Sequence, residues 1–263
     1  MPFVHANGIR MHYEERGQGE PLVLLMGLSA PGSRWEDHVQ AYEQHFRCLL
    51  VDNRGAGDSD KPQGPYTTAM MAADTAGVMQ ALGIEQARVA GISMGSGIAQ
   101  ELALAHPQMV RSLVLIASWA RCEHYIASVF EHLKCMRALS SPAEFTQLLQ
   151  LWIFTAGHYE EHFTELVQGQ RDAAVGYMDL QSFCAQADAC ITHDALDRLE
   201  QLEMPALLTC GGGDIFTPLR LSEIMLERLP NADLLVLPGL GHCHHWEDLE
   251  TFNRETTAFL LEH

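Results

Sequence analysis

Short runs of consecutive apolar residues alternate along this chain with longer segments in which apolar residues recur at helical spacing. A continuous apolar run of four or five residues is typical of a strand buried on both faces, as in a parallel sheet. Such runs, with Arg88 and Thr209 as their polar members, lie at residues 22–26, 48–51, 87–90, 113–116, 206–209 and 234–237. Helical patterns follow at residues 35–44, 68–82, 96–105, 219–229 and 249–261. Strand and helix thus alternate up to residue 117 and again after Pro205, which predicts an α/β fold with a mostly parallel sheet flanked by helices.

The first residues show a different pattern. Apolar and polar residues alternate over residues 4–9 and 11–14, around the dipeptide Asn7-Gly8. Asn-Gly favours a tight turn, so two antiparallel strands are expected here.

Residues 118–202 contain no apolar strand run and are rich in helix formers and aromatic residues. Pro142 and Gly157 are expected to divide this segment into several helices. We therefore predict two parts: a core formed by residues 1–117 and 203–263, and a helical cap formed by the insertion 118–202, which lies over the carboxyl edge of the sheet.

The charge composition narrows the classes of molecule that this protein is expected to bind. The 263 residues carry a formal net charge of −18, with 16 Lys and Arg against 34 Asp and Glu. Such a balance argues against binding to nucleic acid or to an anionic membrane surface, both of which favour basic patches. No signal-peptide pattern opens the sequence, no apolar run approaches a membrane span, and the seven cysteines are scattered, so a cytoplasmic protein with reduced thiols is expected.

The strongest chemical signal is Gly91-Ile92-Ser93-Met94-Gly95, placed between a predicted strand and a predicted helix. A G-x-S-x-G sequence in that context is typical of a nucleophile elbow, a sharp turn that presents the serine oxygen clear of the sheet. Small residues two positions before and after the serine relieve the crowding of this turn. Ser93 is the candidate nucleophile.

A nucleophilic serine needs a base, and the base needs an orienting acid. Asp214 lies in a glycine-rich loop after the strand at 206–209, and His242 follows Gly241 after the strand at 234–237. Both therefore emerge at the same sheet edge as Ser93, which favours Asp214 as the acid and His242 as the base. His244 and His245 are second choices for the base, and the cluster 242–245 is also a possible metal site.

Acyl transfer also needs hydrogen-bond donors for the developing oxyanion. The backbone N–H of Met94 comes with the elbow, and the N–H of Leu28 lies in the loop after the strand at 22–26, where Gly27 permits a turn. Asp52, Arg54 and Asp58 end another buried strand, and we interpret them as residues that fix this loop structurally.

In combination, the elbow, the Asp52-to-Ser59 segment and the Gly241-His242 loop resemble the α/β-hydrolase superfamily, and the resemblance covers nearly the whole chain. The nearest similarity is to small bacterial carboxylesterases and 3-oxoadipate enol-lactonase-like hydrolases. It implies an α/β-hydrolase fold with a helical cap, a Ser-His-Asp triad and no cofactor. The chain has Met26-Gly27 where the family usually has His-Gly, which loosens the assignment to a subgroup.

Two further features of the sequence bear on this interpretation, a histidine pair and a tryptophan. His158-Tyr159-Glu160-Glu161-His162 matches the zinc-peptidase pattern H-x-x-E-H. It lies within the predicted cap, in a chain that already has a complete serine site, so a solvated helix is favoured over a metal site. Trp119 leaves the sheet at the active edge and is the candidate substrate-binding residue among the aromatic residues of the insertion.

The sequence thus predicts a hydrolase that cleaves a small-molecule ester or lactone through an acyl-enzyme, without metal or cofactor. Three alternatives remain open: a cofactor-free perhydrolase, a hydrolase of carbon–carbon bonds with the same triad, and a small-molecule receptor that retains the fold. The substrate and the oligomeric state are not determined by the sequence.

Overall fold

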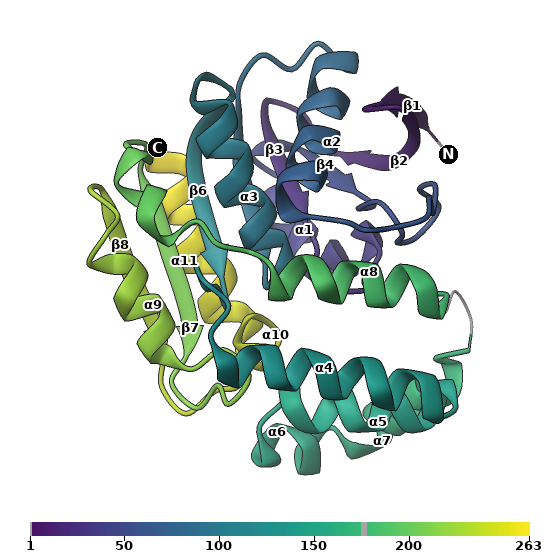
Figure 1. Cartoon of the computed structure of the whole chain (residues 1–263). Coiled ribbons are helices and arrows are strands. Elements are labelled where there is room, and N and C mark those ends of the chain that lie inside the picture. The colour runs from purple at the N-terminus through teal and green to yellow at the C-terminus, as the bar shows by residue number, and fades with distance from the viewer. Residues whose placement is uncertain (1, 175–177) are drawn as a thin grey trace.

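The computed structural model describes residues 2–174 and 178–263, and within them a single eight-stranded sheet forms the centre of the molecule (Figure 1). Its spatial order is β1-β2-β4-β3-β5-β6-β7-β8. The strands are β1 (Phe3–Ala6), β2 (Ile9–Arg16), β3 (Glu20–Leu25), β4 (Phe46–Val51), β5 (Ala87–Ile92), β6 (Val110–Ile116), β7 (Ala206–Gly211) and β8 (Ala232–Leu237). From β4 to β8 every neighbouring pair is parallel, which confirms the predicted sheet.

The antiparallel strands lie at one edge, where β1 pairs with β2 and β2 pairs with β4. Asn7 and Gly8 form the connection between β1 and β2 with φ values of 47° and 80°. Positive φ at both central residues is what a two-residue hairpin turn requires, and Asn and Gly tolerate it best. The predicted hairpin is confirmed.

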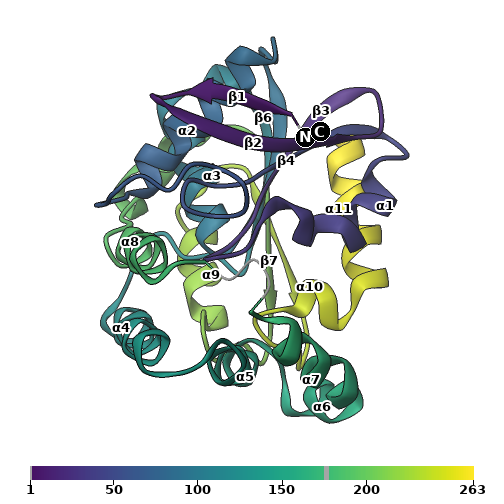
Figure 2. The ribbon, with the colours of Figure 1, turned by 90° about the vertical axis from the view of Figure 1, so that its right-hand side faces the viewer.

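Alternate residues of the central strands belong to two different apolar clusters. Val23 and Leu25 of β3 belong to one cluster, together with residues of α2 (Thr68–Ala81) and α3 (Met94–Ala105). Leu22 and Leu24 belong to the other, with residues of α1 (Glu36–Tyr42) and α11 (Leu249–Glu262). Figure 2 shows these two helix pairs on opposite faces of the sheet. Because both faces are covered, these strands appear as continuous apolar runs in the sequence.

Between β6 and β7 the described chain is helical, and α4 to α7 gather at one end of the molecule, beyond α8 (Figure 1). The bounds are α4 (His124–Leu139), α5 (Pro142–Ile153), α6 (Ala156–Glu161), α7 (Phe163–Asp172), α8 (Leu180–Ile191) and a 3-10 helix, η3 (Leu196–Gln201). Pro142 begins α5, as expected. Gly157 lies inside α6, which corrects its predicted role as a break. The break falls at Phe154, and the Thr155 side chain caps α6 by accepting from His158 N–H.

The segments that enter and leave this helical part lie side by side. Arg121 and Asp194 form an isolated antiparallel bridge, and Ala195 N–H donates to Ala120 O over 2.7 Å. Arg121 also forms ion pairs with Asp194 and Asp197 at 2.8 and 2.7 Å. We call residues 120–122 and 193–195 the stem. The division of the chain at residues 118 and 202 itself stays a prediction.

The remaining helices complete the core. They are the 3-10 helices η1 (Gly32–Trp35) and η2 (Pro107–Met109), and the helices α9 (Leu219–Leu226) and α10 (His244–Glu247). The short helix α10 was not predicted, because four residues are too few to show apolar residues at helical spacing. None of the helices in the described part of the chain has the length and apolar character that crossing a membrane requires.

Candidate active site

Ser93 lies between β5 and α3 in a backbone conformation that few residues with a side chain adopt. Its φ and ψ are 53° and −115°, and its N–H donates to Ile116 O of the neighbouring strand over 2.8 Å. A Cβ on Gly91 would lie 2.3 Å from Gly95 O, so the sharp turn has room only for glycine there. The strained serine and its glycine neighbours are the geometry expected of a nucleophile elbow.

The loop after β3 passes directly over this elbow. A Cβ on Gly95 would lie 2.2 Å from Leu25 O, and a Cβ on Gly27 would lie 3.3 Å from Ser93 Cβ. We call residues 26–30 the β3 loop. It contains Leu28, one of the two predicted oxyanion donors.

The second predicted donor, Met94, is the first residue of α3. The N–H groups in the first turn of a helix have no intrahelical partner and carry the positive end of the helix dipole. The structure therefore brings the β3 loop and the N-terminus of α3 together at Ser93. The roles of Leu28 and Met94 as oxyanion donors stay a prediction.

Asp214 follows β7 and is buried, with both carboxylate oxygens engaged. Oδ1 accepts the backbone N–H groups of Phe216 and Thr217 at 2.7 and 2.8 Å. Oδ2 accepts the Thr217 hydroxyl at 2.7 Å and lies 2.9 Å from His242 Nδ1. The residue thus stabilises its own loop and also contacts the histidine.

Burial would by itself raise the pKa of Asp214, because it disfavours the charged carboxylate. The positive charge of His242 and the hydrogen bonds from His242 and Thr217 outweigh burial and hold the pKa below its ordinary value. Asp214 is therefore ionised at neutral pH and accepts the Nδ1–H of His242. This contact leaves Nε2 as the ring nitrogen available for proton transfer.

His242 is held from two more directions. The Thr217 hydroxyl oxygen lies 3.0 Å from its Nδ1, and the Phe216 ring packs edge-on against the imidazole, with the ring centroids 4.7 Å apart. Sequence reasoning did not assign roles to Phe216 and Thr217. An aspartate often accepts hydrogen bonds from the backbone two and three residues further along a turn. This local pattern could have identified Thr217, which lies three residues after Asp214.

His244 and His245, the second choices for the base, are fully buried in the structure. His244 Nε2 lies 2.9 Å from Thr209 Oγ1, and His245 packs against the rings of His38, Trp246 and Phe252. Burial lowers the pKa of His244 and of His38 to about 4 and that of His245 well below its ordinary value. All three are therefore neutral core residues at physiological pH.

The zinc-peptidase pattern lies on α6 and the following residue. The rings of His158 and His162 stack with centroids 4.2 Å apart, and His162 Nδ1 lies 3.1 Å from Glu165 Oε2. No group of three or more potential His, Cys, Asp or Glu ligands is arranged to hold a metal ion within residues 2–174 and 178–263. All seven cysteines are free.

Trp119 is buried, with 1% of its surface exposed. Its ring packs against Phe130, with a centroid distance of 5.8 Å, and Phe130 in turn packs against Phe216 at 5.3 Å. Because Phe216 contacts His242, two aromatic rings separate Trp119 from the candidate base. A substrate contact of Trp119 stays a prediction.

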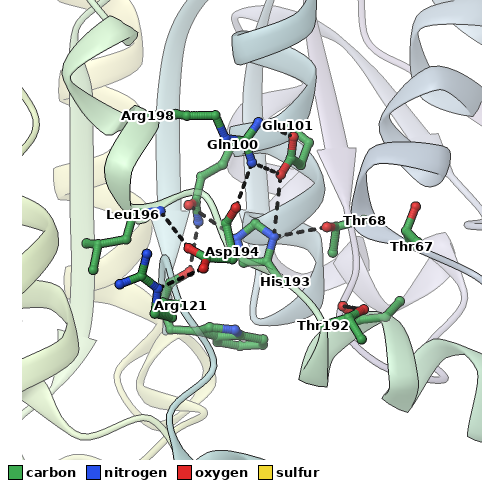
Figure 3. A network of polar contacts seen from close by, with 12 residues as sticks. Thr67, Thr68, Gln100, Glu101, Arg121, Thr192, His193, Asp194, Leu196 and Arg198 are labelled. Carbon is green, nitrogen blue, oxygen red and sulfur yellow. Dashed lines mark hydrogen bonds and ion pairs between the residues drawn. The ribbon is translucent and has the colours of Figure 1, made fainter.

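A polar network joins the stem to α3, the helix that follows Ser93 (Figure 3). His193 Nδ1 lies 2.9 Å from Thr68 Oγ1 of α2, and its Nε2 lies 3.4 Å from Gln100 Oε1 of α3. Gln100 Nε2 donates to Ser118 Oγ and to Trp119 O, and Glu101 of α3 forms an ion pair with Arg198 at 2.6 Å. Ser96 Oγ completes the path, because it lies 2.8 Å from Ser118 Oγ and 2.6 Å from Ser93 O.

With this geometry in place, comparison with known proteins decides the family. Residues 20–249 match the family model described as alpha/beta hydrolase fold. The chain belongs to this family. The predicted superfamily and fold class are thereby confirmed, and membership supports hydrolase chemistry.

Relatives of this α/β-hydrolase carry several names. It is 28% identical to "Putative carbamate hydrolase RutD" of Azorhizobium caulinodans, over 100% of this chain and 99% of the relative. It is 30% identical to "Putative non-heme bromoperoxidase BpoC" of Mycobacterium tuberculosis, over 95% of this chain and 97% of the relative. Among solved structures it is similar to an enol-lactonase from Burkholderia xenovorans, with a TM-score of 0.90, 25% identity and full coverage of both chains. The similarity to an enol-lactonase agrees with the resemblance stated from sequence.

Proposed function

We propose that this protein is a serine hydrolase that cleaves a carboxylic ester or lactone of a small molecule through an acyl-enzyme. Ser93 is the proposed nucleophile, His242 the general base and acid, and Asp214 the residue that orients His242. The backbone N–H groups of Leu28 and Met94 are the proposed oxyanion donors. No metal or cofactor takes part in this chemistry.

One observation carries the proposal: His242 Nδ1 lies 2.9 Å from the buried carboxylate of Asp214. An ionised carboxylate at Nδ1 fixes the imidazole in the tautomer with a free Nε2 and stabilises the imidazolium once it forms. Asp214 and His242 follow β7 and β8, and they leave the sheet at the same carboxyl edge as the elbow serine, where a triad requires them. The strained backbone of Ser93 supports the same conclusion.

In the proposed reaction, Ser93 Oγ attacks the substrate carbonyl carbon while His242 Nε2 takes the hydroxyl proton. The carbonyl oxygen becomes an oxyanion that accepts the N–H groups of Leu28 and Met94. Collapse of this intermediate breaks the bond to the leaving oxygen, which receives the proton from His242. Water then attacks the acyl-enzyme with His242 again as base, and Ser93 is released with the carboxylic acid.

The substrate is proposed to be small and largely apolar at its acyl group. The helical insertion gathers beyond the sheet edge at which Ser93 lies, and a cap in that position favours an enclosed pocket over an open surface. The name of the Azorhizobium caulinodans relative extends the candidate substrates to carbamates, which are attacked at a carbonyl in the same way. The perhydrolase alternative would use peroxide in place of water as the acyl acceptor. A receptor that retains the fold remains the alternative from another class.

A fluorophosphonate probe combined with a substrate screen tests the proposal. The probe is expected to label Ser93, and Ser93→Ala is expected to lose labelling and about 10⁴–10⁶-fold in kcat. The screen compares acetyl, butyryl, octanoyl and palmitoyl aryl esters with small lactones, an aryl carbamate and perhydrolysis. We expect the highest kcat/KM for short acyl groups.

Three results would contradict this proposal. Labelling confined to another serine would refute the assignment of Ser93, and a maximum at palmitoyl would refute the enclosed pocket. No turnover of any substrate, together with tight binding of a small molecule, would favour the receptor.

A further inference from the structure

Gln186 is a buried polar residue of α8 that connects the helical insertion to two loops of the core. None of its surface is exposed. Its Oε1 accepts the backbone N–H of Ser29 at 2.8 Å, and its Nε2 donates to the backbone carbonyl of Arg54 at 2.8 Å. Because one partner is a donor and the other an acceptor, the orientation of the amide is fixed by its surroundings.

Ser29 is the residue of the β3 loop that most needs such support. Its φ is 65°, in the left-handed region that residues with a side chain adopt rarely and that persists only where the surroundings hold it. On the other side of Leu28, Asn53 Nδ2 donates to Met26 O over 2.9 Å. The loop is thus held by one amide side chain on each side of Leu28.

We infer that Gln186 is a positioning residue that holds the β3 loop in the shape that directs Leu28 N–H at Ser93. This inference rests on the proposed function, because it assigns Leu28 as an oxyanion donor. The Ser29 N–H belongs to the peptide that follows Leu28, so fixing it restricts the rotation of the Leu28 backbone. The oxyanion site is complete only while α8 lies against the core.

A misplaced oxyanion donor has a recognisable kinetic effect. The donor contacts the carbonyl oxygen more strongly in the transition state than in the ground state, so its displacement lowers kcat and leaves KM little changed. Removal of one such donor typically lowers kcat about 10²–10³-fold. A purely structural role for Gln186 would instead lower the stability of the fold without this signature.

The first test is Gln186→Leu, which removes both hydrogen bonds at similar volume. We expect kcat for an aryl ester to fall about 100-fold with KM changed less than about threefold. The affinity for an aryl boronic acid, whose adduct with Ser93 is tetrahedral, should fall in parallel with kcat. The matched control is Gln170→Leu in α7, where the glutamine binds Gln150 Oε1 and lies away from the β3 loop, and it should leave both quantities unchanged.

The second test is Gln186→Glu, which keeps the shape of the side chain. It therefore distinguishes an effect of the two hydrogen bonds on kcat from a loss of folding. A protonated carboxyl group reproduces both bonds, with its C=O accepting from Ser29 and its O–H donating to Arg54, whereas a carboxylate repels the Arg54 carbonyl. Two charged residues close to Gln186 are each paired: Arg54, whose carbonyl it binds, with Asp74, and Asp188, on its own helix, with Lys134. The ratio of the kcat of Gln186→Glu to that of wild type should therefore fall as the pH rises from about 5.5 to 9.5, because ionisation of the introduced carboxyl group breaks its bond to the Arg54 carbonyl.

The results that overturn this inference differ from those that overturn the proposed function. If the probe labels Ser93 and Gln186→Leu keeps wild-type kcat and boronic-acid affinity, the inference is wrong and the proposed function stands. If Gln186→Leu does not fold, a ratio for Gln186→Glu that is independent of pH overturns the inference. If Ser93→Ala keeps its activity, the proposed function itself fails.

Discussion

Glu247 accepts both the backbone N–H and the hydroxyl of Thr155, at 2.8 and 2.9 Å. The same carboxylate accepts Gly241 N–H at 3.3 Å, directly before His242. Cys243 N–H adds a bond of 2.9 Å to Ile153 O. The loop that carries the candidate base is therefore fixed by the junction between α5 and α6.

Removing the charge of Glu247 should loosen this loop. In Glu247→Gln, one of the two carboxylate oxygens becomes an NH₂ group. This group faces hydrogen-bond donors, so at least one partly buried N–H loses its acceptor. Such a loss costs about 1–3 kcal/mol, and we expect kcat to fall about tenfold. Steady-state kinetics and urea unfolding check this, with the exposed Glu250→Gln as control. Unchanged kcat and stability would show that the loop holds its shape without Thr155.

The carboxylate of Asp214 should matter far more than the surrounding hydrogen bonds. Asp214→Asn removes the charge at His242 Nδ1, and we expect kcat to fall about 10⁴-fold. Thr217→Val removes one hydrogen bond to that charge, worth about 1.5–3 kcal/mol, and should lower kcat about 10–100-fold. Rates of ester hydrolysis and of phosphonate labelling measure both effects. An Asp214→Asn variant with a tenth of the wild-type activity would contradict the assigned acid.

Two glycine substitutions should change stability in opposite directions. In Gly95→Ala the new Cβ would lie 2.2 Å from Leu25 O, which is backbone, and we expect a loss of about 2 kcal/mol or more. Gly157 lies inside α6 with nothing within 4 Å of its added Cβ, so Gly157→Ala should stabilise the fold by about 0.5–1 kcal/mol. Urea unfolding measures both. Equal midpoints would be incompatible with the close approach of Leu25, at the end of β3, to the elbow.

Stability should fall in mild acid, because buried histidines resist protonation. The pKa values of His38 and His244 are lowered by burial to about 4, from an ordinary value of 6.5. Below pH 6.5 the unfolded chain binds protons that the folded chain does not, so stability is full above about pH 6.5 and is lost as the pH falls toward 4. By pH 4 this amounts to about 3 kcal/mol for each of the two.

Urea unfolding at about pH 7.5 and pH 5 checks this loss. His245 is also buried, with neither ring nitrogen hydrogen-bonded in the described structure, so His245→Phe should reduce the difference between the two midpoints. The exposed His5→Asn should leave the difference unchanged. Midpoints that do not depend on pH in wild type would refute neutral burial of these histidines.

The sheet and the candidate triad were accessible from sequence because each depends on local patterns. Continuous apolar runs identify the buried strands, and Ser93, Asp214 and His242 follow three of them in loops that require glycine. The bonds from Gln186 to Ser29 and from Glu247 to Thr155 were not accessible in this way. They join residues 157 and 92 positions apart, and they depend on how the helical insertion packs, which is decided by side-chain shape and not by periodicity.

The stem has a consequence for how such chains diversify. Because Ala120 and Ala195 are joined by a hydrogen bond, the insertion between them begins and ends at neighbouring points. Recombination could replace it by a segment of another length without altering the order of the strands. A replacement segment would have to meet two conditions. It must supply an acceptor for the Ser29 N–H, and it must supply donors for the Glu247 carboxylate. Exchange of the insertion would therefore alter substrate choice and the support of both catalytic loops in a single event.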